Sequence, residues 1–440
     1  MTAFNLNQFK FTHKADLVEP GKEIFNPRFS YIDTLRGNDQ IIGTSKVNGD
    51  FALEAYAISL AKNGSAITSA QLKNQATVIT YGIKNEGIIN TNNGDDRVRG
   101  RAIADISVSA KTVSDAITIS QKTDAVAIAK AFAEVNVKAI ADGIDNSRGI
   151  LYTGNGSDSV VGDTEGAISA EATAKVDAVA IVEAICKAPM SEGLTAFSGA
   201  IASSIAKASI IATGIKNISG IIATSKGSDT LNASATSSSN NFSLAEISAF
   251  ASANRDNQAL ALAIADATAA AVDKAIAIDN TRGLISTGSG NDTIKARASA
   301  DDIAIAINNT RGSIDTGNGH DTIEAIATGS EAYGIFGGTI STARGNDRVI
   351  ASSFGGGVNI HLGDGNDFIQ GFGEAKVYGG RDLDTISFGS YEKDDFQISF
   401  GASNNNSVSF KLDGITMITT EFEQFNFANG SYTYNELKIA

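Results

Sequence analysis

Several residue types are scarce in this chain of 440 residues, which has one cysteine, three histidines, three prolines and no tryptophan. The single cysteine, Cys186, excludes an intrachain disulfide and fits a small buried apolar residue. No run approaches the roughly 18 uncharged apolar residues that a membrane span needs, so no membrane span is expected. The N-terminus lacks a basic start followed by a long apolar core, so no secretory signal peptide of the usual kind is expected.

Motifs for catalysis are missing as well. His13, His320 and His361 are far apart in the sequence, and none has an obvious carboxylate partner. The chain contains no G-x-S-x-G, no H-E-x-x-H and no phosphate-binding loop. We therefore expect no catalytic residues and no enzyme activity.

The chain is acidic, with a net charge of −14 and a pI of about 4.7. Such a surface repels nucleic acid and attracts cations, so no nucleic-acid partner is expected. Apolar residues make up 42% of the chain, enough for an ordered core. Glycine occurs 44 times and alanine is abundant, which favours thin, regular layers over a bulky globular core.

One short loop recurs along the chain, with the pattern I-x-T-x-x-G-x-D-x-[I/V/L]. It reads "IDTGNGHDTI" in one copy, and a divergent last copy reads "VYGGRDLDTI". The recurring aspartates are Asp39, Asp96, Asp158, Asp229, Asp292, Asp321, Asp347, Asp367 and Asp384. The gaps between them are 57, 62, 71, 63, 29, 26, 20 and 17 residues. This repetition indicates a solenoid. Each late gap fits one coil, and each of the first four fits two or three coils or a single coil with insertions.

A second repeat accompanies the loop, because an I-x-N triplet lies 11 or 12 residues before five of the aspartates. Its asparagines are Asn85, Asn146, Asn217, Asn280 and Asn309. Arg-Gly or a related turn signal separates the triplet from the loop. Each unit therefore reads strand, turn, strand, turn, strand.

Alanine-rich segments separate the units, at residues 101–145, 165–215 and 245–280. In residues 125–134, alanine alternates with larger side chains, and this period of two favours strands. The high helix propensity of alanine favours helices, with Ile128, Phe132 and Val135 on one face. Both alternatives are open from the sequence, and the recurring alternation favours strands.

The composition changes near residue 385, since 10 of the 30 aromatic residues lie in the last 56 positions. Alternating apolar residues there predict antiparallel hairpins that cap the solenoid. We predict an all-β protein, a right-handed parallel β-helix or β-roll solenoid with a C-terminal antiparallel β cap. Its parts are an N-terminal cap (1–30), the solenoid (31–384) and an aromatic-rich C-terminal region (385–440).

The glycine–aspartate loops suit a hard divalent cation. Glycines permit turn conformations that present carbonyl oxygens, and each aspartate adds an anionic oxygen. Calcium takes six to eight oxygens, more than one loop supplies, so two stacked loops would share an ion. Ordinary turns with a local aspartate hydrogen bond are the alternative for the early copies.

Several loops resemble the RTX, or haemolysin-type, calcium-binding nonapeptide G-G-x-G-x-D-x-U-x, among them "TGSGNDTI" and "LGDGNDFI". The long alanine-rich units resemble repeats of cyanobacterial RTX-like proteins. The tail "TTEFEQFNFANGSYTYNEL" resembles the C-terminal segments of RTX proteins that are exported by type I secretion. The match is specific over residues 286–387 and looser before them. The last copy departs from the pattern, with Asp382 in place of the second glycine.

The resemblance implies that the loop aspartates bind several Ca²⁺ ions, with glycine carbonyls as further ligands. The implied metal-binding residues are Gly154, Gly156, Asp158, Gly288, Gly290, Asp292, Gly317, Gly319, Asp321, Gly345, Asp347, Gly363, Gly365, Asp367, Gly380, Asp382 and Asp384. It also implies a secreted protein, extracellular or at the cell surface, that leaves by type I secretion and folds where calcium is abundant. The expected role is structural or adhesive, with calcium and a surface polysaccharide or protein as partners.

Two other functions stay open from the sequence. Arg148, Arg282 and Arg311 recur at one unit position. They predict either a stabilising row or a row that binds glycans or carboxylates. A polysaccharide-binding or polysaccharide-modifying β-helix, of lyase or epimerase type, is therefore the alternative. A row of threonines, which includes Thr287 and Thr316, is a weaker indication of ice binding.

Overall fold

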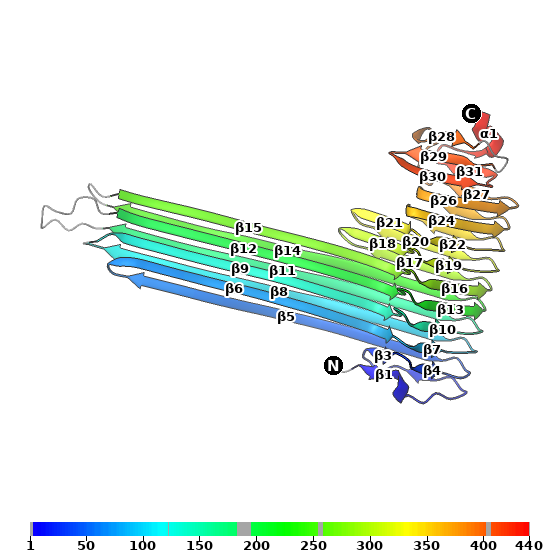
Figure 1. Cartoon of the computed structure of the whole chain (residues 1–440), viewed down its shortest axis with the longest axis horizontal. Helices are drawn as coiled ribbons and strands as arrows, with labels where there is room; N and C mark the ends of the chain where they lie inside the picture. The colour runs from blue at the N-terminus through cyan, green and yellow to red at the C-terminus, as the bar shows by residue number, and fades with distance from the viewer. Residues whose placement is uncertain (1–2, 122, 183–194, 254–257, 402–405, 440) are drawn as a thin grey trace.

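The computed structural model describes residues 3–121, 123–182, 195–253, 258–401 and 406–439. Strands wind in successive coils from the N-terminal end to the C-terminal end, and neighbouring coils pair in parallel (Figure 1). The predicted all-β solenoid is therefore confirmed. Cys186, predicted to be a small buried residue, lies outside the described residues.

One coil shows how a repeat unit folds. Strand β8 (Arg97–Ser120) runs away from the body, and β9 (Ala125–Asp145) returns along it. After a tight turn, β10 (Ile150–Tyr152) leads into a glycine–aspartate loop. Strand β11 (Ser159–Val182) then begins the next coil and pairs with β8 in parallel along its whole length. The predicted order of strand, turn, strand, turn, strand is correct.

Neighbouring coils pair through three series of strands. The first contains β2 (Leu17–Val18), β5 (Gln40–Ala61), β8, β11, β14 (Thr230–Ala253), β17 (Thr293–Ser299), β20 (Thr322–Thr328), β23 (Arg348–Ala351), β25 (Phe368–Gln370), β27 (Thr385–Ser387), β31 (Gln424–Phe427) and β32 (Gly430–Thr433). The second contains β1 (Phe4–Asn5), β3 (Ile24–Asn26), β6 (Gly64–Asn85), β9, β12 (Thr195–Lys216), β15 (Gln258–Asp279), β18 (Ile303–Asn308), β21 (Glu331–Phe336), β24 (Phe354–Asp364), β26 (Gly373–Arg381), β30 (Ile415–Thr420), β29 (Val408–Leu412) and β28 (Gln397–Phe400). The third contains β4 (Tyr31–Asp33), β7 (Ile88–Asn90), β10, β13 (Ile221–Lys226), β16 (Leu284–Ser289), β19 (Ser313–Asp315) and β22 (Thr339–Ser341), which joins β24.

Of the two alternatives for each long gap, two or three coils is wrong, and a single coil with additional residues is correct. Asp158 and Asp229 are 71 positions apart in the sequence but lie only one coil apart, because the N–H of Asp158 donates to Oδ1 of Asp229. The additional length lies in the strands, which reach 21–24 residues in β5, β6, β8, β9, β11, β12, β14 and β15. Strands usually have three to ten residues, and these extend about 70–80 Å. We call these eight strands the wing, since they project from the body in two layers (Figure 1).

Alanine explains how two such long layers pack. Along β9 the buried side chains alternate with half-buried or exposed ones, and the buried series includes Ala127, Ala129, Ala131 and Ala133. Strand β11 buries a similar series opposite them, so small methyl groups fill a narrow interior. The strand interpretation of the alanine-rich segments is correct wherever the structure describes them, and the helical alternative is wrong.

The body has larger buried residues than the wing. Ile278, at the inner end of β15, packs there with Ile285 and Ile294 from the other two sides of the coil, and equivalent residues repeat in the other coils. At the C-terminal end, β28, β29 and β30 form an antiparallel sheet, and β31 and β32 form a hairpin followed by helix α1 (Tyr434–Ile439). The predicted antiparallel hairpins are thus present. Short 3₁₀ helices, η1 (Leu6–Gln8) and η2 (Lys393–Asp395), lie near the two ends.

The coils after β15 are short, and we call them, from β16 to α1, the tower. Strand β18 pairs with residues 274–279 of β15, at the inner end of the wing. The tower rises from this inner end, and the outer part of β15 has no strand above it (Figure 1).

Candidate metal centre: a buried ladder of aspartates

The glycine–aspartate loops stack on one another along one edge of the body. In the central copy the loop connects β19 to β20, and Asn318 forms parallel bridges to Ser289 and Arg344 in the neighbouring loops. The sequence spacing of 29 and 26 residues around Asp321 therefore corresponds to one coil on each side. This stacking places equivalent residues of all copies in rows.

In the eight loops that have it, the second glycine is required by the stacking itself. Gly319 has a φ of 144°, and its N–H donates to the carbonyl oxygen of Arg344 at 2.8 Å. A Cβ atom at this position would overlap the carbonyl oxygen of Gly290 in the preceding coil. These glycines are thus explained by close backbone approach, and their carbonyl oxygens point along the coil axis toward the next loop.

The first glycine position is left-handed in every copy. Where the residue is not glycine, the backbone still adopts positive φ, with 76° at Leu35, 65° at Asn92, 99° at Ser225 and 64° at Ala343. Non-glycine residues in this conformation cost about 1–2 kcal/mol. In several copies, with or without glycine, the carbonyl oxygen at this position accepts a backbone N–H from the next coil, as Gly288 does from Asn318 at 3.0 Å and Ala343 does from Asp364 at 2.8 Å.

The aspartates form a continuous hydrogen-bonded ladder inside the body. The N–H of Asp292 donates to Oδ1 of Asp321 at 2.8 Å, and the N–H of Asp321 donates to Oδ1 of Asp347 at 2.7 Å. The remaining links of 2.7–2.9 Å join Asp39 to Asp96, Asp96 to Asp158, Asp158 to Asp229, Asp229 to Asp292, Asp347 to Asp367 and Asp367 to Asp384. The structure therefore brings together all nine aspartates that the repeat identified. We call them the aspartate ladder.

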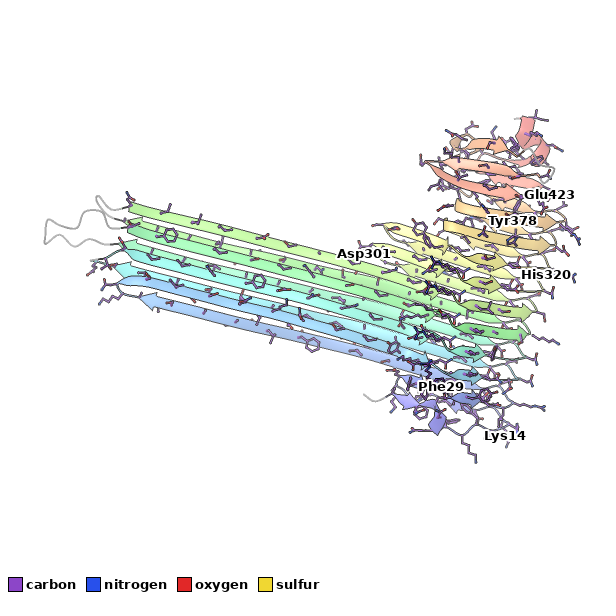
Figure 2. All side chains as sticks on the ribbon, viewed as in Figure 1. Lys14, Phe29, Asp301, His320, Tyr378 and Glu423 are labelled. Carbon is purple, nitrogen blue, oxygen red and sulfur yellow. The ribbon has the colours of Figure 1, made fainter. Side chains whose placement is uncertain are left out.

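Sequence reasoning missed the two ends of the ladder. The N–H of Asp16 donates to Oδ1 of Asp39 at 2.8 Å, and the N–H of Asp384 donates to Oε2 of Glu423 at 2.9 Å. Neither Asp16 nor Glu423 lies in a copy of the repeat, so no sequence signal identified them. Glu423 adds a tenth acceptor carboxylate at the C-terminal end (Figure 2).

The second oxygen of every ladder carboxylate is buried without a partner. The nine aspartates are 0–2% exposed, and within the described residues none of their Oδ2 atoms has a hydrogen bond of good geometry. In seven copies the threonine five positions earlier, such as Thr316 before Asp321, lies close enough for its hydroxyl to lower the pKa of the carboxyl against the effect of burial. Burial raises the pKa of Asp321 and Asp347 to about 6, although the backbone N–H of the preceding coil acts in the opposite direction. Burial likewise raises the pKa of Asp158 and Asp384 to about 7, and neighbouring carboxylates contribute to that increase. A buried carboxylate without a partner is unfavourable unless it gains a proton or a cation.

This donor set fits a hard cation in part. Successive Oδ2 atoms follow the strand spacing of about 4.8 Å, so an ion between two coils could contact two carboxylates. Within the described residues, no three acidic, histidine or cysteine side chains converge on one point. The carbonyls of second-position glycines such as Gly290 face the next coil, and the first-position carbonyls of Gly288 and Gly317 already accept backbone N–H groups there. Asp382 replaces a glycine at a φ of 81°, and its role as a ligand stays a prediction.

A second ladder runs along the outer side of the loops. The N–H of His320 donates to Oδ1 of Asn291 at 2.8 Å, and Nδ1 of His320 accepts the N–H of Asn346 at 2.7 Å. His320 is exposed and lies at the loop edge (Figure 2), and it serves here as a backbone acceptor in place of asparagine. His361, by contrast, stacks on Tyr378 at 4.6 Å between ring centroids.

The asparagines of the I-x-N triplets form a third ladder at the opposite turn. Nδ2 of Asn146 donates to Oδ1 of Asn217 at 2.8 Å, and Nδ2 of Asn217 donates to Oδ1 of Asn280 at 2.8 Å. Each Nδ2 also reaches a backbone carbonyl of the next coil, as Asn217 reaches Leu284 at 3.1 Å. These buried amides add side-chain hydrogen bonds between coils to the backbone pairing that the turn already has, which gives them a structural role.

The threonine and arginine rows have different surroundings. Thr287 is buried, and its hydroxyl donates to the carbonyl of Thr316 at 3.2 Å. The other threonines of the row are 0–2% exposed, so an exposed ice-binding surface at these positions is wrong. Arg148, Arg282 and Arg311 are exposed at left-handed turn positions. No carboxylate of the described residues lies within 4.0 Å of their guanidinium groups.

Comparisons with known proteins give no family and a weak structural alignment. No protein-family model and no curated protein sequence matches the chain. One solved structure, an X-ray structure of a hyperactive, Ca²⁺-dependent, β-helical antifreeze protein from an Antarctic bacterium, aligns with 98% of this chain and 93% of its own. The identity is 14% and the TM-score is 0.22, values too low to carry a conclusion about this chain. Among the described residues, no helix is long and apolar enough to cross a membrane.

Proposed function

We propose that this protein is a calcium-stabilised structural or adhesive solenoid that works outside the cell. The observation that carries this proposal is the row of buried, unpartnered Oδ2 atoms on the aspartate ladder. A row of buried carboxylates opposes stacking of the coils at neutral pH, and a divalent cation between coils would remove this opposition. Calcium is preferred over magnesium because it tolerates irregular oxygen geometry.

Calcium would then couple folding to location. In a cytosol with little free calcium, the ladder carboxylates would repel one another and weaken the packing of the coils. Outside the cell, millimolar calcium would neutralise them. The resemblance of the loops and of the tail to RTX proteins supports export by type I secretion, which is part of the proposal. The proposal also includes a role at the cell surface, with a polysaccharide or another surface protein as partner.

Thermal unfolding with and without calcium tests the proposal. Calcium at 1–5 mM, roughly the extracellular range, should raise the melting temperature measured by circular dichroism, and magnesium at the same concentration should raise it less. Isothermal titration calorimetry should detect more than one bound ion per chain. Equal melting temperatures in calcium and in a calcium chelator would contradict the proposal.

A polysaccharide-binding function is a second candidate, which a pocket at the junction of wing and body favours. Its lining combines Tyr81 and four cations, Arg28, Lys84, Arg148 and Lys216, with the carboxylates of Glu86 and Asp145. Lys84 pairs with Glu86 at 2.8 Å and Lys216 pairs with Asp142 at 2.9 Å. Within the described residues this leaves the guanidinium groups of Arg28 and Arg148 to receive a carboxylated sugar. Binding of an oligomeric uronate that is lost in Arg148→Ala would support it, and the absence of binding by the wild type would exclude it.

A further inference from the structure

The wing ends in two open edges that the rest of the chain leaves uncovered. Strand β14 pairs with β17 only over Thr230–Thr236, and β15 pairs with β18 only from Lys274 onward. Residues 258–272 of β15 are all exposed, on both faces of the strand. The outer parts of β14 and β15 therefore present unpaired backbone N–H and C=O groups over about 50 Å.

We call the edge formed by residues 237–253 of β14 and 258–272 of β15 the upper edge. It lacks the features that usually protect an edge strand. Single-chain proteins blunt such edges with prolines, lysines, bulges or short strands. Residues 258–272 contain no proline and no basic residue, and Asp266 is their one charge. Residues 237–253 of β14 likewise carry one charge, Glu246. The exposed apolar side chains here include Leu260 and Leu262, which are 58% and 48% exposed.

The opposite edge of the wing, formed by the outer parts of β5 and β6 and called the lower edge, carries more charged residues. The corresponding parts of β5 and β6 carry Lys46, Asp50, Glu54 and Lys73. These charges make the lower edge the less favourable of the two for strand pairing. The upper edge is the better candidate for an interface.

We propose that the upper edge pairs with the same edge of a second copy of this chain, so that two wings form one continuous two-layer structure. Strand β15 would pair with β15 of the second copy and β14 with β14, related by a two-fold axis perpendicular to the sheets. Closed two-fold dimers are the commonest form of self-association. The unpaired backbone groups of β14 and those of β15 would then both be hydrogen-bonded by the equivalent strand of the second copy.

The tower determines the direction of pairing. A second copy added parallel to β15 would place its own body at the inner end of the wing, where the tower already stands (Figure 1). An antiparallel copy places its body beyond the tip of the first wing, and its wing lies alongside the tower. Antiparallel pairing is therefore the arrangement that avoids steric overlap.

The area of this contact is sufficient for a stable dimer. The free edge is about 50 Å long, and two sheets about 10 Å apart with their outer side chains are about 20 Å thick. Each copy would bury about 1,000 Å², or about 2,000 Å² in total, at the upper end of the standard size for specific interfaces.

Lysine substitutions at the edge test the dimer directly. Ala263 and Ala267 lie on the inner face of β15, in register with the inward-facing Ala200 and Ser204, yet both are exposed. The double variant Ala263→Lys, Ala267→Lys should convert a dimer of 45.4 kDa chains to a monomer in sedimentation velocity. The control Leu53→Lys changes an exposed, inward-facing position on the lower edge and should stay dimeric. A circular dichroism melt should show that both variants are folded.

Cysteine crosslinking tests the geometry. In a Cys186→Ser background, single cysteines at 261, 263, 265, 267 and 269 should form intermolecular disulfides with a maximum at one position, because antiparallel self-pairing brings one residue opposite itself. A monomeric wild type, loss of the dimer in Leu53→Lys alone, or no crosslink along β15 would each overturn the proposal. Co-purification with a different protein that the lysine variant releases would also overturn self-pairing.

Discussion

Replacement of a single ladder aspartate separates two effects that we attribute to its carboxylate: the free-energy cost of burying a charge and the binding of calcium. In Asp321→Asn, Oδ1 can still accept the N–H of Asp292, but the buried charge disappears and an amide group replaces Oδ2. A carboxyl whose pKa is about 6 in the folded protein and about 3.9 in the unfolded chain opposes folding by about 3 kcal/mol at pH 7. An unpaired buried amide costs about 1–3 kcal/mol, which offsets much of this gain.

We therefore expect opposite results with and without calcium. Without calcium, Asp321→Asn should unfold in urea with a free energy of unfolding equal to that of the wild type or higher by about 1–2 kcal/mol. With calcium, the variant should gain less stability than the wild type, because Asp321 lies between Asp292 and Asp347 and would serve two neighbouring sites. Calorimetry should show about one or two fewer bound ions.

The matched control is Asp315→Asn, six positions earlier in the same segment. Asp315 is exposed at the end of β19, so its replacement should leave both the calcium response and the calcium-free stability within about 0.5 kcal/mol of the wild type. An Asp321→Asn protein that keeps the full calcium response and stoichiometry would refute the role of the aspartate ladder as a metal site.

Three further predictions concern the stability of the coils. Because burial raises the pKa of ladder carboxyls such as Asp347, the folded protein binds protons more tightly than the unfolded chain. Urea unfolding without calcium should therefore show stability rising from about pH 8 to pH 5, and a fall over this range would contradict the burial. The substitution Ala343→Gly relieves a left-handed backbone and should stabilise by about 0.5–1 kcal/mol in thermal melts, whereas a loss would argue against strain there. Asn217→Ala should lower the free energy of unfolding by about 2–4 kcal/mol, because it leaves the buried amides of Asn146 and Asn280 without their partner. The exposed control Asn240→Ala should have little effect, and equal effects of the two substitutions would contradict a stabilising role of the asparagine ladder.

Much of the candidate site could be predicted because repeats stack. Residues at the same offset in each unit must lie in rows once neighbouring coils pair in register, and the aspartates and asparagines do so. The orientation of the threonines was less predictable. A threonine row can face ice or the interior, and only the packed coil shows that Thr287 and its equivalents are buried.

The ends of the ladder could not be predicted for a different reason. Asp16 and Glu423 lie outside the repeat, and they reach the ladder through the way that the terminal segments fold over the first and last coils. The same holds for His320, whose ring nitrogen replaces an asparagine oxygen in the outer ladder. Such roles depend on contacts between coils and leave no pattern within one unit.

By itself, the sequence determined that the chain is an all-β solenoid with an aspartate at a fixed offset in each repeat unit, because period-two patterning and the offset of aspartate act locally and repeat. Only the tertiary structure decided how the long gaps are used. An alternating alanine segment is compatible with several coils or with one long strand pair, since both bury the same small side chains. The parallel pairing of β8, β11 and β14 along their full lengths selects the long strands. The wing and its open edge follow from that pairing, because the coils after β15 are too short to cover it.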